Sequence, residues 1–298
     1  MKSTKTPTRT DSRSGRFYDI ALPDGTTARY PSVTTILSAA IAKPALIAWS
    51  AKEERTAVSE AAADFYAETI ASPQLPRPMY LLGLEQRLGR TKAHLKALAK
   101  AAEIGSQAHA AVEWAMKTQL LGLAAGPRPP MVEGAELAFK SWQTWAQAVA
   151  LEPVLAEQCV WSHTHQYAGT LDLVATLQPQ ALLAVLERQG AVEPALAAWL
   201  AGRDRVTAVI DLKTSKSIYA EASLQTVAYI RALQEMGHGP VDGGLIVRLP
   251  KTVGDPGFEV AVVPPARELF PTFLAARQLF NWTYAEEQRY QARRRAVA

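Results

Sequence analysis

The segment Val209-Ile210-Asp211-Leu212-Lys213 places an acid and a base at the end of a short apolar run. A continuous apolar run of this length is typical of a buried strand. Because side chains alternate between the two faces of a strand, Asp211 and Lys213 project from the same face. A carboxylate beside an ammonium can hold a divalent cation together with a water or phosphoryl oxygen. A surface ion pair is the alternative, and it is the commoner meaning of an isolated Asp-x-Lys.

A second acid, Asp172, lies in Tyr167-Ala168-Gly169-Thr170-Leu171-Asp172-Leu173-Val174, which is also predicted to be a strand. Gly169 allows another part of the chain to approach the backbone closely. Asp172 and Asp211 would then be two acids on neighbouring strands, the minimum for a hard-cation site. Without a cation, two such carboxylates repel each other.

Two predicted helices add further polar groups. His109 follows Gly105-Ser106-Gln107-Ala108, and Glu113, four residues later, shares its helix face and can orient it. Gln225 and Tyr229 also lie four residues apart, on the helix after Lys213, and can hydrogen-bond to a phosphate or a carboxylate. The alternatives are an ordinary structural histidine and a tyrosine on the buried face of its helix.

The order Gly-x-x-x-His, Glu, Gly-x-x-Asp, Asp-x-Lys, Gln-x-x-x-Tyr resembles the PD-(D/E)XK nuclease superfamily, and more narrowly its RecB-like exonuclease branch. Tyr30-Pro31-Ser32-Val33-Thr34-Thr35-Ile36-Leu37, followed by Lys43-Pro44 and Trp49, is similar to the start of phage and mitochondrial-genome-maintenance-type exonucleases. The resemblance spans roughly residues 28–235. Cys159 is the single cysteine, so the chain resembles the members without an iron–sulfur cluster.

The resemblance implies an α/β, restriction-endonuclease-like fold: a mixed central sheet flanked by helices, with a helical N-terminal subdomain. It implies that Lys213 activates or orients water and that Gln225 and Tyr229 support the site and the DNA backbone. Glu157 matches the acid that precedes the Gly-x-x-Asp strand and would assist the ligands, as Glu113 would. The ligands it implies for Mg²⁺ or Mn²⁺ are His109, Asp172, Asp211 and the Leu212 carbonyl.

The implied activity is a metal-dependent DNA exonuclease of phage or bacterial recombination and repair. Its expected partner is DNA that is single-stranded or has a free end. One alternative is a structure-specific or restriction-like endonuclease of the same fold, and another is a catalytically inactive DNA-binding module.

The composition excludes several other classes of protein. Of the 298 residues, 48 % are hydrophobic and 20 % are charged, which is ordinary for a globular chain. A single cysteine excludes an intrachain disulfide framework and a cysteine-based zinc site. No apolar run approaches the roughly 18–20 residues that span a bilayer, and residues 1–16 contain no secretory apolar region. We therefore expect a cytoplasmic protein with no membrane partner, and the resemblance implies that the cell is bacterial or phage-infected.

The charge is mildly basic, with 32 Lys and Arg against 28 Asp and Glu, which permits nucleic-acid binding. Residues 87–100 contain five basic residues and no acid, and Lys92, Lys96 and Lys100 share one helix face. This face is either simply solvated or a ridge that guides phosphates toward His109. Arg293-Arg294-Arg295 would add non-specific affinity. The predicted DNA contacts are Arg87, Arg90, Lys92, Lys96, Lys216 and Arg231.

The chain is predicted to have three parts. Residues 1–15 form a flexible basic tail. Residues 16–150 contain a hairpin and helices that carry the His109 motif, and residues 151–298 form the nuclease core in the order ββ, then βαββα. An insertion at 177–205, predicted to be a helical hairpin, interrupts this core.

Overall fold

The computed structural model describes residues 7–12, 14–22, 24–69, 76–121, 126–192, 194–263 and 269–297. The chain divides into two compact units, one made of Met1–Ile41 with Gln107–Ala298 and the other of Ala42–Ser106. The boundary therefore lies inside a helix at Ser106, whereas the sequence placed one at residue 150. The larger unit contains both sheets and all residues of the candidate site.

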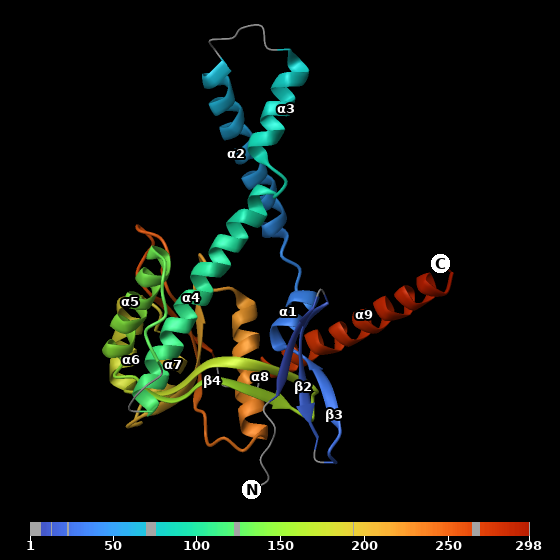
Figure 1. Cartoon of the computed structure of the whole chain (residues 1–298). Helices are drawn as coiled ribbons and strands as arrows, with labels where there is room; N and C mark the ends of the chain where they lie inside the picture. Colours follow the sequence, from blue (N-terminus) through green and yellow to red (C-terminus); the bar gives the residue numbers. More distant parts are fainter. Residues whose placement is uncertain are drawn as a thin grey trace. The chain divides into compact units, whose positions relative to one another are not determined.

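A mixed five-stranded sheet forms the centre of the larger unit (Figure 1). Its strands, in spatial order, are β4 (Glu152–Ser162), β5 (Tyr167–Leu177), β6 (Val206–Lys213), β7 (Gly243–Arg248) and β8 (Glu259–Val263). Only β6 and β7 are parallel. Parallel neighbours need a crossover, and α8 (Ala220–Glu235) supplies it. The predicted α/β class with a mixed sheet is confirmed.

A second, three-stranded sheet precedes the central one in the chain. It consists of β1 (Thr8–Ser12), β2 (Gly15–Ala21) and β3 (Thr27–Pro31). The predicted hairpin is confirmed, although Pro23 of its turn lies outside the described residues. The prediction of an unstructured tail through residue 15 is wrong for Thr8–Ser12, which pairs with β2. The Asp11 carboxylate of β1 pairs with Arg9 of the same strand and with Arg16 of β2.

Helix α1 (Val33–Ala40) begins after Ser32, because the Ser32 hydroxyl caps it by accepting a hydrogen bond from the Thr35 amide at 3.0 Å. An isolated bridge between Ser32 and Ala168 connects this helix start to β5. Val33 and Ile36 are fully buried in the main core, together with residues of β5, α8 and α9 (Phe270–Val297). Each such buried side chain stabilises the fold by roughly 1.5–3 kcal/mol.

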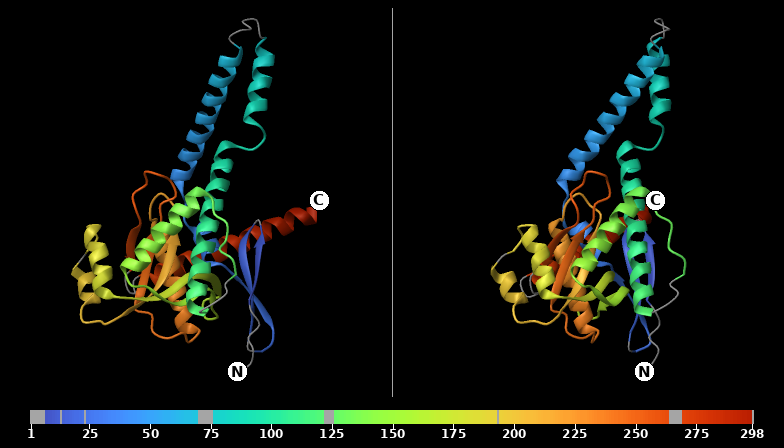
Figure 2. Two further views of the ribbon diagram at one scale, coloured as in Figure 1. Left: turned by 60° about the vertical axis from the view of Figure 1, so that its left-hand side comes forward. Right: turned by 90° about the vertical axis from the view of Figure 1, so that its left-hand side faces the viewer.

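Two further groups of helices belong to this unit. Helix α5 (Glu133–Ala148) buries Phe139, Trp142 and Trp145. The insertion at 177–205 is the predicted helical hairpin, made of α6 (Pro179–Arg188) and α7 (Pro194–Leu200), which lie side by side in Figure 2. A proline occupies the first position of each of these helices, where its missing N–H costs no hydrogen bond.

The unit Ala42–Ser106 consists of α2 (Pro44–Thr69), α3 (Arg77–Leu88) and the first part of α4 (Ala93–Leu121). Gly89, at a φ of 68°, ends α3, and α4 continues without a break through Gly105. Leu46 and Ile47, in the first turn of α2, are 49 % and 74 % exposed. Most of the predicted 71–79 loop, and Gly122, lie outside the described residues.

Across the ranges described, no single helix is both long enough and apolar enough to cross a membrane. Helix α1 and residues 44–68, taken together as a bent pair, meet the same requirement for length and composition.

Candidate active site

Three carboxylates occupy one row across three neighbouring strands. Strand β4 pairs Ala156 with Leu173 and Gln158 with Leu171, and β5 pairs Leu173 with Ile210. In these registers Glu157 lies opposite Asp172 on one side. Extending the β5–β6 pairing by one residue places Asp211 opposite Asp172 on the other side. Residues that lie opposite each other in adjacent strands project from the same face of the sheet. Glu157 itself has a φ of 49°, a backbone strain of the kind found at functional sites.

Asp172 is held at both of its oxygens. Its Oδ1 lies 3.3 Å from Nδ1 of His109 on α4, and its Oδ2 accepts a hydrogen bond from the Leu212 amide at 2.8 Å. One ligand atom each from His109, Glu157 and Asp172 lies within 4.8 Å of the others. A nitrogen and two carboxylate oxygens therefore converge from α4, β4 and β5, a donor set suited to a divalent cation.

Asp211 belongs to an adjoining hydrogen-bonded network. Its Oδ1 accepts hydrogen bonds from Nζ of Lys213 at 2.8 Å and from Nε2 of Gln225 at 2.9 Å. Lys213 also donates to Oε1 of Gln225 at 3.3 Å, and Gln225 contacts the Tyr229 hydroxyl at 3.4 Å. Asp211 Oδ2 is buried, lies 2.7 Å from Lys213 Nζ, and accepts no hydrogen bond within the described ranges. The predicted helix face of Gln225 and Tyr229 therefore does reach the aspartate.

Gly169 has a steric role in this network. A Cβ at this position would lie 2.5 Å from Cε1 of Tyr229, closer than real contacts allow. The glycine of the Gly-x-x-Asp motif thus lets α8 approach β5 closely enough for Gln225 to reach Asp211.

The charges of the cluster are strongly coupled. Burial lowers the pKa of His109, but the Asp172 carboxylate outweighs it and raises that pKa to about 9. Burial raises the pKa of Asp172, while the charges of His109 and Lys213 bring it below its ordinary value. Burial, aided by the charge of Asp172, raises the pKa of Glu157 to about 7. Burial also raises the pKa of Asp211 to about 6, although Lys213 opposes the shift.

Two acids of the row therefore bind protons near neutral pH, and a cation competes with those protons for the same oxygens. The folded chain holds the Glu157 proton more tightly than the unfolded chain does. The stability that the protonated Glu157 side chain contributes is therefore fully present below pH 4.5, the ordinary pKa of the group. This stability is lost as the pH rises through about 7.

Glu157→Gln should remove this pH dependence. In EDTA at pH 8 we expect the variant to exceed the wild type in free energy of unfolding by about 1–2 kcal/mol, a value discounted for partial exposure. At pH 5 the difference should shrink. Urea unfolding at pH 8 and at pH 5 measures the difference in free energy of unfolding between the variant and the wild type. Equal free energies at pH 8 would show that the charge of Glu157 does not destabilise the metal-free protein.

Two of the predicted partners lie elsewhere. Glu113 is paired with Lys117, not with His109, so the prediction that it orients His109 is wrong. It still acts on the cluster, since its charge helps to raise the pKa of Glu157 after burial and Asp172. Arg231 lies over the ring of Phe270 at 5.4 Å, because it is two residues beyond Tyr229 and leaves another face of α8. Arg231 thus packs on an aromatic ring of α9, and its role as a DNA contact stays a prediction.

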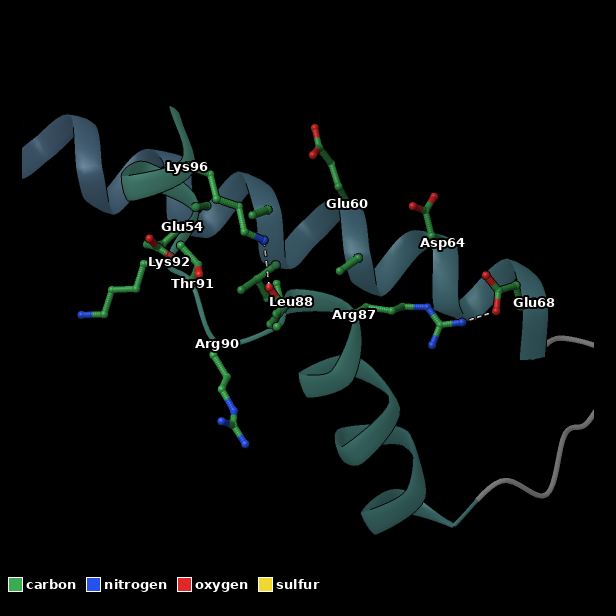
Figure 3. Close-up of a pocket in the computed structure, with 15 residues that line it drawn as sticks. Glu54, Glu60, Asp64, Glu68, Arg87, Leu88, Arg90, Thr91, Lys92 and Lys96 are labelled. Atoms are coloured by element: carbon green, nitrogen blue, oxygen red, sulfur yellow. Dashed lines mark hydrogen bonds and ion pairs between the residues drawn. The ribbon is translucent and has the colours of Figure 1, made fainter. Parts of the chain in front are cut away.

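The predicted basic ridge is only partly available for binding. Within the unit Ala42–Ser106, Arg87 pairs with Glu68 and covers the Phe65 ring, and Lys96 donates to the Leu88 carbonyl. Both line a cavity of about 540 Å³ that also contains acids of α2. Arg90 and Lys92 point away from those acids in Figure 3, and within the part of the chain described they have no ion-pair partner.

Lys251 is a candidate that the sequence analysis missed. The last pair of the parallel strands β6 and β7 joins Lys213 to Arg248, so Lys216 and Lys251 each follow by three residues at the same sheet edge. Burial, together with the charge of Lys216, lowers the pKa of Lys251. Lys216 and Lys251 occupy matching positions only because β6 and β7 pair in parallel. The signal in the sequence was a lysine at the same distance beyond each of two predicted strands.

A scan of protein-family models found none that matches this chain, and a search of curated proteins likewise found no match.

Proposed function

We propose that this protein is a Mg²⁺- or Mn²⁺-dependent deoxyribonuclease that removes nucleotides from DNA ends, preferentially from single strands. The observation that carries the proposal is the row Glu157, Asp172 and Asp211 across β4, β5 and β6, joined by His109 and Lys213. Such an activity would process DNA ends in phage or bacterial recombination and repair. The β4–β5 hairpin, the parallel β6–β7 pair and the α8 crossover support a restriction-endonuclease-like form of this sheet.

The residues present fit a divalent cation. His109, Glu157 and Asp172 offer converging donor atoms, and Asp211 Oδ2 is a buried oxygen that accepts no hydrogen bond within the described part of the chain. These four residues would hold the ion, and the Leu212 carbonyl remains a predicted ligand. A bound Mg²⁺ or Mn²⁺ would polarise a phosphoryl oxygen and lower the pKa of a coordinated water.

Lys213 acts as a hydrogen-bond donor in this reaction. Burial lowers the pKa of its ammonium, but Asp211 and Asp172 outweigh burial and raise it above the ordinary value. A lysine that stays protonated at neutral pH cannot serve as a general base. Its Nζ, fixed by Asp211 and Gln225, can orient water or donate to the charge that develops on the phosphoryl oxygens.

Linear and circular single-stranded DNA distinguish the candidate functions. With Mg²⁺ we expect end-labelled linear DNA to be shortened from an end and circles to remain intact, and with EDTA we expect neither to react. Cut circles would favour an endonuclease of the same fold. Binding without cleavage in Mg²⁺ and Mn²⁺ would favour an inactive DNA-binding module.

Metal binding can be tested without DNA. Mn²⁺ at about one hundred times its dissociation constant should stabilise the wild type by about 2.7 kcal/mol. Asp172→Asn should lose most of this gain, because it removes a charged ligand next to His109. Thermal unfolding with and without Mn²⁺ measures the gain, and an unchanged gain in the variant would remove Asp172 from the metal site.

The matched control is Asp242→Asn. Asp242 is also partly buried and paired, with Arg203 at 2.9 Å and the Thr207 amide at 2.8 Å, at the opposite end of β6. This variant should be destabilised with and without Mn²⁺ alike, so its gain from the metal should match that of the wild type.

A further inference from the structure

Helix α9 changes character along its length. Its first half carries Phe273 and Phe280, which are buried in the main core, and Tyr284 stacks on Phe280. From residue 285 onward, every residue whose side chain is described is exposed except Glu286. The C-terminal turns extend beyond the strands of their own unit (Figure 1). Helices in proteins derive most of their stability from packing, so a long exposed continuation suggests a partner that packs against it.

The exposed turns carry large aromatic side chains on one face. Trp282 is 64 % exposed, and Arg289 and Arg293, seven and eleven residues later, lie almost directly above it on the helix. Leu279 and Tyr290, which are 44 % and 60 % exposed, both lie to one side of this line, and Glu286 lies between the line and Tyr290. We call Leu279, Trp282, Arg289, Tyr290 and Arg293 the α9 stripe. It alternates apolar and aromatic groups with guanidinium groups along a single face.

The charge of the stripe is positive. Residues 288–298 contain four arginines and no acid. Within the described ranges, Arg289 pairs only with Glu286 at 2.6 Å on the surface, and Arg293 has no ion-pair partner. An exposed pair of this kind contributes little to stability, so a phosphate can replace Glu286 at small cost. The stripe therefore fits a polyanion.

We infer that the α9 stripe binds single-stranded nucleic acid, with Trp282 and Tyr290 stacking on bases and the arginines contacting phosphates. Exposed aromatic rings beside a positive track are the features that bind unpaired strands. A second copy of the chain is disfavoured, because the same face would bring like charges together. A membrane surface is disfavoured, because amphipathic helices keep apolar and basic residues on opposite faces. The inference deepens the proposed function by giving the DNA strand a second contact away from the cluster.

The test measures the binding of labelled oligo(dT) to the full-length protein in EDTA, so that no cleavage occurs. Trp282→Ala should weaken binding about tenfold or more, whereas Trp282→Phe, which keeps a ring, should retain most of it. Arg293→Glu should weaken binding and lower the slope of log affinity against log salt by about 0.7 for each phosphate that the variant no longer neutralises. The matched control is Arg188→Glu, the same charge reversal at the exposed end of α6.

Two results would overturn the inference. The first is wild-type affinity of Trp282→Ala for oligo(dT). The second is a wild-type dimer that Trp282→Ala converts to a monomer, which would make the stripe a self-association surface. If the wild type binds oligo(dT) through the stripe but cleaves no DNA, the inference stands and the proposed nuclease function fails.

Discussion

Asp211→Ala is expected to remain folded, to bind DNA and to lose metal-dependent cleavage by at least about a thousandfold. The buried Oδ2 of Asp211 accepts no hydrogen bond in the described chain and would be available to the proposed cation, while Oδ1 fixes Lys213 and Gln225. The substitution removes a carboxylate from both functions. A loss of about 4 kcal/mol of transition-state stabilisation corresponds to that factor.

The measurement is single-turnover cleavage of end-labelled single-stranded DNA in Mg²⁺ and in Mn²⁺, with DNA affinity measured separately in EDTA. Asp211→Asn is a second variant that keeps the side-chain volume if the alanine variant folds poorly. Asp242→Asn, at the other end of β6, should cleave at the wild-type rate per folded molecule. Near-wild-type cleavage by folded Asp211→Ala or Asp211→Asn would show that the site is assigned incorrectly.

Lys213→Met is expected to lower the maximal cleavage rate by about a hundredfold to a thousandfold, the usual cost of losing one donor to developing charge. Stabilisation by Mn²⁺ should be retained, because the cluster of His109, Glu157 and Asp172 is intact. Methionine preserves the apolar stem but cannot donate. Lys213→Met should therefore impair cleavage but not metal binding. Asp172→Asn, in contrast, should impair both.

The ion pair between Lys213 and Asp211 calls for a double variant. Lys213→Met alone leaves a buried carboxylate without its cation, which is costly. The double variant Asp211→Asn with Lys213→Met removes both charges of this pair. It should therefore be more stable than Lys213→Met alone. If the two residues act as one unit, the double variant should cleave no more slowly than the worse single variant. Effects that simply multiply would contradict the shared network.

Local sequence patterns predicted most of the elements around the site. The apolar run that ends at Lys213 predicted the strand β6, and the spacing of Gln225 and Tyr229 predicted the helix α8. These features depend on residues only a few positions apart, so they can be recognised in the sequence alone. The same spacing rules placed Gln225 and Tyr229 on one face of α8, next to Asp211.

Only the tertiary structure decided which acids stand together. The sequence grouped His109, Asp172 and Asp211 as ligands and gave Glu157 a minor part, whereas the ligand atoms that converge are those of His109, Glu157 and Asp172. That grouping depends on the register of β4 against β5 and on the path of α4. A register is set by the burial of whole strand faces, and a shift of one residue would turn every side chain to the other face.

The partners of charged residues were likewise decided by the fold. Glu113 pairs with Lys117, Arg87 pairs with Glu68, and Arg231 lies on Phe270, although the sequence assigned all three residues to the cluster or to DNA. The type of each charged residue specifies its sign but not its neighbour, since many opposite charges and rings are available along the chain. Packing of the elements brings one of them within reach, and it was the parallel pairing of β6 with β7 that placed Lys251 at the same edge as Lys216.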